Sequence, residues 1–399
     1  MPKKIIAAMV TTGRADYGLL YPLINKIVES DDFELRLIAA GTHFSYLHGK
    51  TIQLIKKDGV KIAGKVKMTS RKDTKNAICN SISTGLQKFS KLFNKMMPDF
   101  LIVLGDRYEL WAACMVAVIH NIPIVHIHGG EVTAGAIDDP IRHSITKMSV
   151  FHFASVDLYA KRIIQMGENP KNVFCVGAIG LDNINNIKLL TCEELSKITK
   201  IDFMKKNVAL LTYHPVTLEA YVDAEQQIQE VLQALLKTDL LILITMPNAD
   251  SARIVIYKKI ESYIKQYPNK FKLIKNLGQK GYLSAMQYAR MMIGNSSSGI
   301  IEGASFKLPV VNVGDRQSGR FRPQNVIDCG CSQQDILKAI ERALSKEFNE
   351  SIAQLENLYG DGHTADRIVK ALEKLDFSNK TQYLKKGFYD LPQSLDHIN

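Results

Sequence analysis

In the first half of the chain, several residues with carboxylate and imidazole side chains directly follow apolar segments. They form three motifs, Gly105-Asp106-Arg107, His126-Ile127-His128-Gly129-Gly130-Glu131 and Ile137-Asp138-Asp139-Pro140-Ile141-Arg142-His143. A carboxylate at the end of a buried segment destabilises the fold unless it is paired. The three motifs contain more carboxylates than a fold requires, which indicates a functional site. Groups of these types that share one site can remove and return protons near neutral pH. The motifs therefore predict proton-transfer chemistry.

The histidines also admit plainer interpretations. A single histidine is more often a buried residue with a hydrogen-bond partner than a catalytic group. His126, His128 and Glu131 together have the ligand types of a zinc site. His126 and His128 are two residues apart, however, so on a strand their side chains would point to opposite faces. We therefore predict no metal site and no cofactor.

Small and hydroxyl-bearing residues form a second group in the other half of the chain. The motif Gly294-Asn295-Ser296-Ser297-Ser298-Gly299 follows an apolar segment, and Glu302 and Gly314-Asp315-Arg316-Gln317 come after it. Hydroxyls and backbone N–H groups at a helix start can bind a diphosphate, over which an arginine can close. Glu302 could accept from both hydroxyls of a ribose. The alternative is that the serines only cap a helix.

Arg14 belongs to a similar turn, Thr12-Gly13-Arg14-Ala15-Asp16. An arginine at a helix N-terminus can pair with a phosphate, whereas in the plainer reading Asp16 is an N-cap and Arg14 is solvated. The glycines lack the dinucleotide-binding spacing, so NAD is not predicted. Two more polar motifs follow apolar segments later in the chain, Tyr213-His214-Pro215-Val216-Thr217 and Pro247-Asn248-Ala249-Asp250.

The elements that must position these residues alternate short apolar runs with amphipathic stretches, which is typical of parallel βαβ units. We predict strands at 5–11, 34–40, 61–67, 99–104, 122–127, 150–154, 173–176, 208–213, 240–245, 271–274, 291–293, 310–313 and 326–328. We predict helices at 17–29, 77–95, 108–120, 158–165, 224–236, 252–266, 282–288, 299–305 and 364–375. Ligands of such sheets bind at the carboxyl ends of the strands, where the polar motifs lie.

A chain of 399 residues fits two α/β domains. A polar, lysine-rich stretch at 183–206 interrupts the alternation. We therefore expect two Rossmann-like, doubly wound parallel-sheet domains at 1–190 and 191–375, and a tail at 376–399 that packs back on the first domain.

Composition excludes several classes of protein. The net charge of +11 suits an anionic ligand, but the lysines are spread out and no aromatic-interleaved basic cluster predicts nucleic-acid binding. No apolar run approaches the roughly 18 residues that a membrane span needs, and residues 5–10 fit a strand better than a signal peptide. The six cysteines are scattered, which favours reduced thiols in a cytoplasmic protein over a disulfide framework.

The motifs and their order along the chain resemble those of the hydrolysing UDP-N-acetylglucosamine 2-epimerases of bacterial sialic-acid and capsule pathways. The resemblance covers nearly the whole chain. The matching segments are Gly13 to Tyr17, Gly41 to His43, Leu104 to Glu109, His126 to Glu131, Asp138 to Lys147, His214 to Thr217, Gly294 to Gly299 and Gly314 to Gln317. The resemblance implies a glycosyltransferase-B-like fold with the active site in the interdomain cleft. It also implies that the final helix crosses back to the first domain and that the protein is a homodimer or homotetramer.

The activity implied by this resemblance converts UDP-N-acetylglucosamine to N-acetylmannosamine and UDP. A base takes the C2 proton while UDP leaves C1 by anti elimination, and water then adds to the 2-acetamidoglucal. Asp106, Glu131 and Asp138 match the acid/base positions collectively, and His214 matches a histidine facing the leaving group. The chain departs from much of the family at His128, where glutamate is common, so the roles of His128 and Glu131 stay open.

The remaining site residues implied by the resemblance bind the nucleotide sugar. Arg14, Ser296, Ser297 and Arg316 match diphosphate contacts, Glu302 the ribose contact and Leu277 the uracil position, with His43, Arg107 and Asn248 as further contacts. Four alternatives stay open: the same chemistry on a 2,4-diacetamido-2,4,6-trideoxy sugar nucleotide of legionaminic-acid pathways, a non-hydrolysing epimerase, a glycosyltransferase-B-type sugar transferase, and a nucleotide-sugar sensor without turnover.

Overall fold

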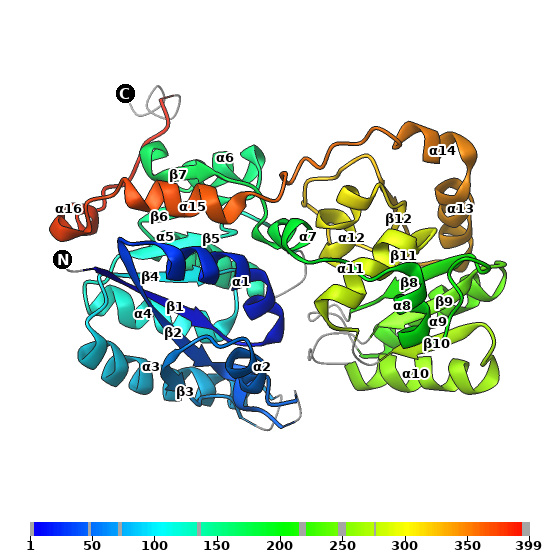
Figure 1. Ribbon diagram of the computed structural model, residues 1–399, viewed down its shortest axis with the longest axis horizontal. Helices are drawn as coiled ribbons and strands as arrows, with labels where there is room; N and C mark the ends of the chain where they lie inside the picture. Colours follow the sequence, from blue (N-terminus) through cyan, green and yellow to red (C-terminus); the bar gives the residue numbers. More distant parts are fainter. Residues whose placement is uncertain are drawn as a thin grey trace. The chain divides into compact units, whose positions relative to one another are not determined.

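The computed structural model describes residues 4–46, 49–70, 74–133, 137–214, 221–245, 253–274 and 277–392. The chain divides into two compact units. The first comprises Met1–Glu131, Asp138–Asn183 and Tyr359–Asn399, and the second comprises Val132–Ile137 and Ile184–Leu358. Each unit is a parallel sheet with helices packed against it (Figure 1).

The first unit is built on a seven-stranded sheet in the order β3-β2-β1-β4-β5-β6-β7. The strands are β1 (Ile5–Thr11), β2 (Phe33–Ala40), β3 (Ile62–Val66), β4 (Phe100–Leu104), β5 (Ile124–Ile127), β6 (Phe151–Ala154) and β7 (Val173–Cys175). All neighbouring pairs are parallel. The strand order reverses between β1 and β4, which is where doubly wound sheets bind ligands.

Helices cover both faces of this sheet because its strands bury both faces. They are α1 (Arg14–Glu29), α2 (Ile52–Lys57), α3 (Lys75–Met96), α4 (Tyr108–Ile119), α5 (Asp138–Met148), α6 (Asp157–Gln165), α15 (Thr364–Glu373) and α16 (Thr381–Leu384). The short helix α7 (Asp182–Asn186) spans the point where the two units divide. Met9 packs in one apolar cluster with α1 and α15, and its neighbour Val10 packs in another with α3 and α4. The two neighbours pack on opposite faces of the sheet because successive side chains of a strand point in opposite directions.

The second unit repeats the plan with a six-stranded sheet, in the order β10-β9-β8-β11-β12-β13. Its strands are β8 (Val208–Thr212), β9 (Leu241–Thr245), β10 (Phe271–Ile274), β11 (Met291–Gly294), β12 (Val310–Val313) and β13 (Val326–Cys329). Its helices are α8 (Cys192–Thr199), α9 (Tyr221–Leu236), α10 (Arg253–Gln266), α11 (Gly278–Tyr288), α12 (Ser297–Ile301), α13 (Gln333–Leu344) and α14 (Lys346–Ser351). Here the order reverses between β8 and β11.

The predicted fold class of two Rossmann-like parallel-sheet domains is confirmed. Each predicted strand has a counterpart, and those at 5–11, 271–274 and 310–313 have the predicted bounds. The helix predicted at 299–305 is instead two short pieces, α12 and the 3₁₀ helix Gly303–Phe306. The stretch at 183–206 contains α8, whose N-cap Thr191 forms a capping box with Glu194.

The division of the chain differs from the predicted boundaries. The units part between Asn183 and Ile184 rather than after residue 190. Residues 359–375 belong to the first unit rather than the second, which is what the resemblance implied for the final helix. The Asp182 carboxylate explains this, because it accepts from the backbone N–H groups of Thr364 and Ala365 at 2.9 and 2.7 Å and so caps α15. Ile368 and Leu372 of that helix then pack in the first unit's core.

Candidate active site

Asp106 follows β4 at the reversal of the first sheet. It comes after Gly105, whose φ of +85° forms the turn, and its Oδ2 accepts a hydrogen bond from Nη2 of Arg142. Arg142 lies on α5 and is only 4% exposed. The guanidinium therefore fixes the carboxylate and supplies a positive charge beside it. The sequence motif contains Arg142 but does not single it out.

Glu131 and His128 form a second pair in the first unit. Nδ1 of His128 lies 3.0 Å from Oε1 of Glu131, which also accepts from the hydroxyl of Ser155 at 3.0 Å. The backbone N–H of Ile179 donates to Nε2 of His128 at 3.3 Å. Because an N–H can only donate, Nε2 is an acceptor and a neutral ring carries its proton on Nδ1, toward Glu131. His128 thus orients the buried carboxylate.

His126 has the plainer role. Its ring is fully buried, with Nε2 2.8 Å from the carbonyl of Gly105 and Nδ1 3.2 Å from the hydroxyl of Thr146. Burial lowers the pKa of His126 to about 3, so the ring is neutral at pH 7. His128 lies beyond the end of β5 with φ +64°, so the strand alternation expected of the two histidines does not apply. Among the described residues, no cluster of His, Cys, Asp and Glu could hold a metal ion.

Asp138 is the first residue of α5 and is half-buried. It stands four residues before Arg142, so the two share a face of the helix. The same helix ends near Lys147, whose ammonium lies 2.7 Å from Glu168. Helix α5 therefore carries Asp138 and the partner of Asp106 together.

The turn after β1 is organised by Asp16. Its carboxylate accepts from the N–H groups of Thr12 and Gly13 at 2.5 and 2.7 Å, which leaves Arg14 exposed at the first position of α1. His43 is fully buried between the hydroxyls of Thr11 and Thr51, at 3.0 and 2.9 Å.

Burial lowers the pKa of His43 to about 4, so the ring is neutral at pH 7. The ring has no exposed surface, so the substrate contact predicted for His43 would require a rearrangement. Arg107, by contrast, is 40% exposed, and its Nε lies 3.5 Å from the buried Glu109.

In the second unit, Asn295 holds His214. The amide of Asn295 accepts from the His214 N–H at 2.7 Å and donates to the His214 carbonyl at 2.8 Å. The carbonyl of Asn295 accepts from Arg316 at 3.1 Å and from Gln317 at 2.8 Å. Burial, with the charge of Arg316, lowers the pKa of His214 to about 3, so the imidazole is neutral at pH 7.

Gly294 makes this arrangement possible. Its φ is +135°, and a Cβ there would overlap the carbonyl of Thr212 at the end of β8. Only glycine lets β11 approach β8 this closely. The approach brings Asn295 beside His214. The sequence motif contains both Gly294 and Asn295 but predicts neither of these roles.

The serine motif begins the short helix α12. Ser296 is its N-cap and accepts from the N–H of Ser298 at 3.4 Å. Ser297 and Glu302 are half-buried at its start and end, and Leu277 is half-buried directly before α11. The predicted contact Asn248 lies outside the described residues. The structure thus places His214, Ser296, Ser297 and Arg316 shortly after the carboxyl ends of β8, β11 and β12, and Glu302 at the end of α12.

A cavity of about 510 Å³ opens at this edge of the second sheet. Its lining includes Tyr213, Asn295, Arg316, Arg322 and Asp328. Arg322 pairs with Asp328 through Nε at 3.0 Å. Arg316 is the predicted phosphate contact that reaches this cavity, so the cation stands at a solvent-accessible edge.

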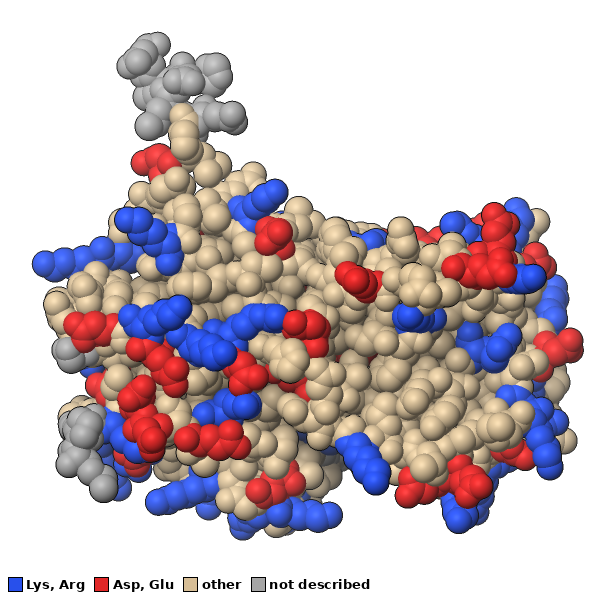
Figure 2. Space-filling view, turned by 45° about the horizontal axis from the view of Figure 1, so that its top comes forward, with Lys and Arg blue, Asp and Glu red and all other residues tan. Residues whose placement is uncertain are grey.

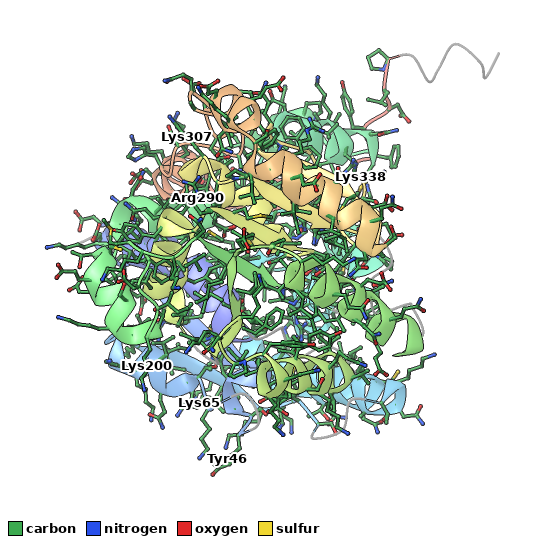
Figure 3. All side chains as sticks on the ribbon, turned by 90° about the vertical axis from the view of Figure 1, so that its right-hand side faces the viewer. Tyr46, Lys65, Lys200, Arg290, Lys307 and Lys338 are labelled. Carbon is green, nitrogen blue, oxygen red and sulfur yellow. The ribbon has the colours of Figure 1, made fainter. Side chains whose placement is uncertain are left out.

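On the face drawn in Figure 2, basic and acidic side chains are interspersed. Lys65, Lys200 and Lys338, which Figure 3 labels, are exposed. Among the described residues, no helix has the length and apolar character to cross a membrane.

A family model described as UDP-N-acetylglucosamine 2-epimerase matches residues 25–373. The chain belongs to the UDP-N-acetylglucosamine 2-epimerase family. This family member is 40% identical over 385 residues to the GDP/UDP-N,N'-diacetylbacillosamine 2-epimerase (hydrolyzing) of Campylobacter jejuni, covering 96% of this chain and 98% of that protein.

Other relatives are nearly as similar. Identity is 38% over 376 residues to the UDP-N,N'-diacetylbacillosamine 2-epimerase (hydrolyzing) of Legionella pneumophila, with 94% and 97% covered. It is 34% over 393 residues to the polysialic acid biosynthesis protein P7 of Escherichia coli, with 98% of each covered. In fold, this epimerase-family chain is similar to the UDP-GlcNAc 2-epimerase from Neisseria meningitidis bound to UDP-GlcNAc, with a TM-score of 0.80, 18% identity, and 94% and 100% covered.

Proposed function

We propose that this protein is a hydrolysing 2-epimerase whose substrate is a nucleoside-diphosphate 2,4-diacetamido-2,4,6-trideoxyglucose, that is, N,N'-diacetylbacillosamine. The observation that carries the proposal is the 40% and 38% identity, over nearly the full chain, to proteins named for this reaction. UDP-N-acetylglucosamine, the first substrate suggested by the sequence motifs, becomes the second candidate. It keeps support from the 34% identity to the polysialic acid protein.

The proposed reaction has two stages. A base takes the proton from C2 of the sugar, the C2 electron pair forms the C1–C2 double bond, and the nucleoside diphosphate leaves C1 with the C–O bonding pair. Water then adds across the double bond of the glucal and places a hydroxyl group at C1. C2 receives its new proton on the face opposite to the one from which the first proton left. The net change is hydrolysis of the C1–O bond with inversion at C2.

The first unit supplies the acid/base groups in this proposal. Asp106, Glu131 and Asp138 act as one set, because neighbouring carboxylates titrate together. Three contacts support it: Arg142 fixes Asp106, and His128 and Ser155 both fix Glu131. Acid/base groups held in place near the C2–H lower the activation free energy, because less entropy is lost in reaching the reactive geometry. His128 serves here by orienting Glu131, since its Nε2 already accepts from Ile179.

The second unit binds the nucleotide in this proposal. Ser296, Ser297 and Arg316 contact the diphosphate, and a cation there stabilises the leaving group. Arg14 remains the phosphate contact expected from the first unit. Glu302 accepts from the ribose, and the backbone near Leu277 meets the base. His214 faces the leaving oxygen as a neutral hydrogen-bond donor, consistent with its low pKa. Arg107 and Asn248 are the remaining expected contacts, whereas a contact from His43 would require its buried ring to become exposed.

Product analysis tests the substrate. The enzyme is incubated with the UDP and GDP forms of N,N'-diacetylbacillosamine and with UDP-N-acetylglucosamine, and kcat/KM is measured for each by release of the diphosphate. We expect the diacetamido sugar to be preferred by at least about tenfold, the scale that one or two changed sugar contacts produce. Preference for UDP-N-acetylglucosamine would reverse the substrate assignment, and transfer of intact sugar to an acceptor would indicate a transferase.

A further inference from the structure

Five hydroxyl groups in the second unit form a continuous chain that ends at the serine motif. Oγ1 of Thr245 lies 2.7 Å from Oγ1 of Thr212, which lies 3.2 Å from the phenol oxygen of Tyr282. That phenol lies 2.7 Å from Oγ of Ser298, which lies 2.8 Å from Oγ of Ser296. The chain therefore joins β9, β8, α11 and α12.

A chain of this kind has a direction. Each hydroxyl has one proton to donate and two lone pairs to accept with. If Ser296 donates to an anion, Ser298 donates to Ser296, Tyr282 donates to Ser298, and Thr212 donates to Tyr282. Each such bond polarises the next, so a chain oriented toward an anion binds it more strongly than isolated hydroxyls do.

Tyr282 stands at the centre of the chain. Burial raises its pKa to about 12, so the phenol keeps its proton throughout the physiological range. Its ring packs against an apolar cluster that includes Leu283 and Met286. A Tyr282→Phe change therefore removes the central donor and keeps the ring.

We propose that Tyr282 is a positioning residue for the diphosphate, because its O–H, braced by Thr212, sets the direction in which Ser298 and Ser296 donate. The proposal rests on the proposed function, in which Ser296 contacts the diphosphate. Tyr282 itself touches no substrate in this account. It acts through the two serines.

Tyr288 offers a matched control. It lies on the same helix, and its hydroxyl donates to the carbonyl of Leu190 at 3.3 Å, away from the serine motif. Tyr288→Phe thus removes one tyrosine hydroxyl from α11 without touching the chain. A loss specific to Tyr282→Phe cannot then be ascribed to a general weakening of that helix.

Titration calorimetry of the full chain with UDP and with uridine tests the idea. We expect Tyr282→Phe to weaken UDP binding about tenfold, the scale of one lost hydrogen bond in an anion site. Uridine binding should not change, and Tyr288→Phe should bind UDP like the wild type. Ser298→Ala should cause a similar loss, and the double variant should lose little more, because both changes break one chain.

Two results would overturn the proposal. One is wild-type UDP affinity in Tyr282→Phe, and the other is equal weakening of UDP and uridine, which a merely structural role would produce. A wild-type protein that binds neither UDP nor GDP would instead contradict the proposed function itself, so the two failures are distinguishable.

Discussion

Arg142 and Asp106 are joined by a hydrogen bond from Nη2 to Oδ2, although 36 residues separate them. The contact ties the turn after β4 to helix α5, whose first residue is Asp138. Two of the three proposed acid/base carboxylates are thus held by one element. The guanidinium is almost fully buried, so nothing from solvent could replace it if it were removed.

Arg142→Met should therefore abolish most of the turnover. Removing the cation leaves Asp106 without its orienting partner, and we expect kcat to fall by about 100-fold or more, the contribution typical of a positioned acid/base group. Binding of free UDP should be retained. Steady-state kinetics with calorimetry checks this. Arg36→Met serves as the control because its ion pair with Glu34 is only half-buried. Turnover near the wild-type rate would remove this ion pair from the mechanism.

Glu302→Gln tests the nucleotide site. If the carboxylate accepts from ribose hydroxyls, the amide should weaken UDP binding by about 1 to 3 kcal/mol. Glu341→Gln, on the exposed side of α13, serves as the control. Calorimetry with UDP gives the answer, and unchanged affinity in the Glu302 variant would contradict the ribose assignment.

Buried neutral histidines predict a loss of stability in acid. His126 has a pKa of about 3 in the folded protein and about 6.5 when unfolded, so below pH 6.5 the unfolded chain binds the extra proton. The free energy of unfolding should then fall by about 1.4 kcal/mol per pH unit for this group between roughly pH 6 and pH 4. His126→Gln should remove that share of the slope, measured by denaturant unfolding at several pH values. An unchanged slope would show that His126 is not a buried neutral ring.

Lys386 ties the C-terminal segment to helix α5. Its ammonium donates to the carbonyls of Lys147 and Ser149 at 2.6 and 2.7 Å and lies 2.6 Å from Glu168. His152 also pairs with Glu168, at 3.0 Å. Removing one partner of such a cluster leaves a buried carboxylate less compensated.

Lys386→Met should consequently lower the free energy of unfolding by about 2 kcal/mol. Lys385→Met is the matched control, since that neighbour is exposed and should change stability by less than about 0.5 kcal/mol. Thermal unfolding monitored by circular dichroism distinguishes the two. Equal melting temperatures for both variants would mean that the tail is not anchored through Lys386.

Much of the fold follows from local pattern. Strands buried on both faces, such as β4 and β8, are continuous apolar runs and are predicted to within a residue or two. The helix at 299–305 is predicted less well because a stretch with small, polar residues lacks a helical period, and the chain there forms two short turns. Helix α15 joins the first unit through Asp182, a contact across 182 residues that no local pattern contains.

The site shows the same division. Residue types and their place after strands predict Asp106, Glu131 and the serine motif, because parallel strands bring their carboxyl ends to one edge. The partners that hold these residues, Arg142 and Asn295, are visible only in three dimensions. The burial of His43 could not be predicted from the sequence either, because it depends on the packing of Thr11 and Thr51 around the ring.

The most direct test of the central claim is the fate of the C2 hydrogen. Turnover of UDP-N,N'-diacetylbacillosamine is run in deuterated water, and the released sugar is examined by NMR and mass spectrometry. If carboxylates of the first unit remove the C2 proton and water completes the hydrolysis, the free sugar is the 2-epimer and carries one deuterium at C2. Released sugar that retains its hydrogen and its configuration at C2 would contradict the account.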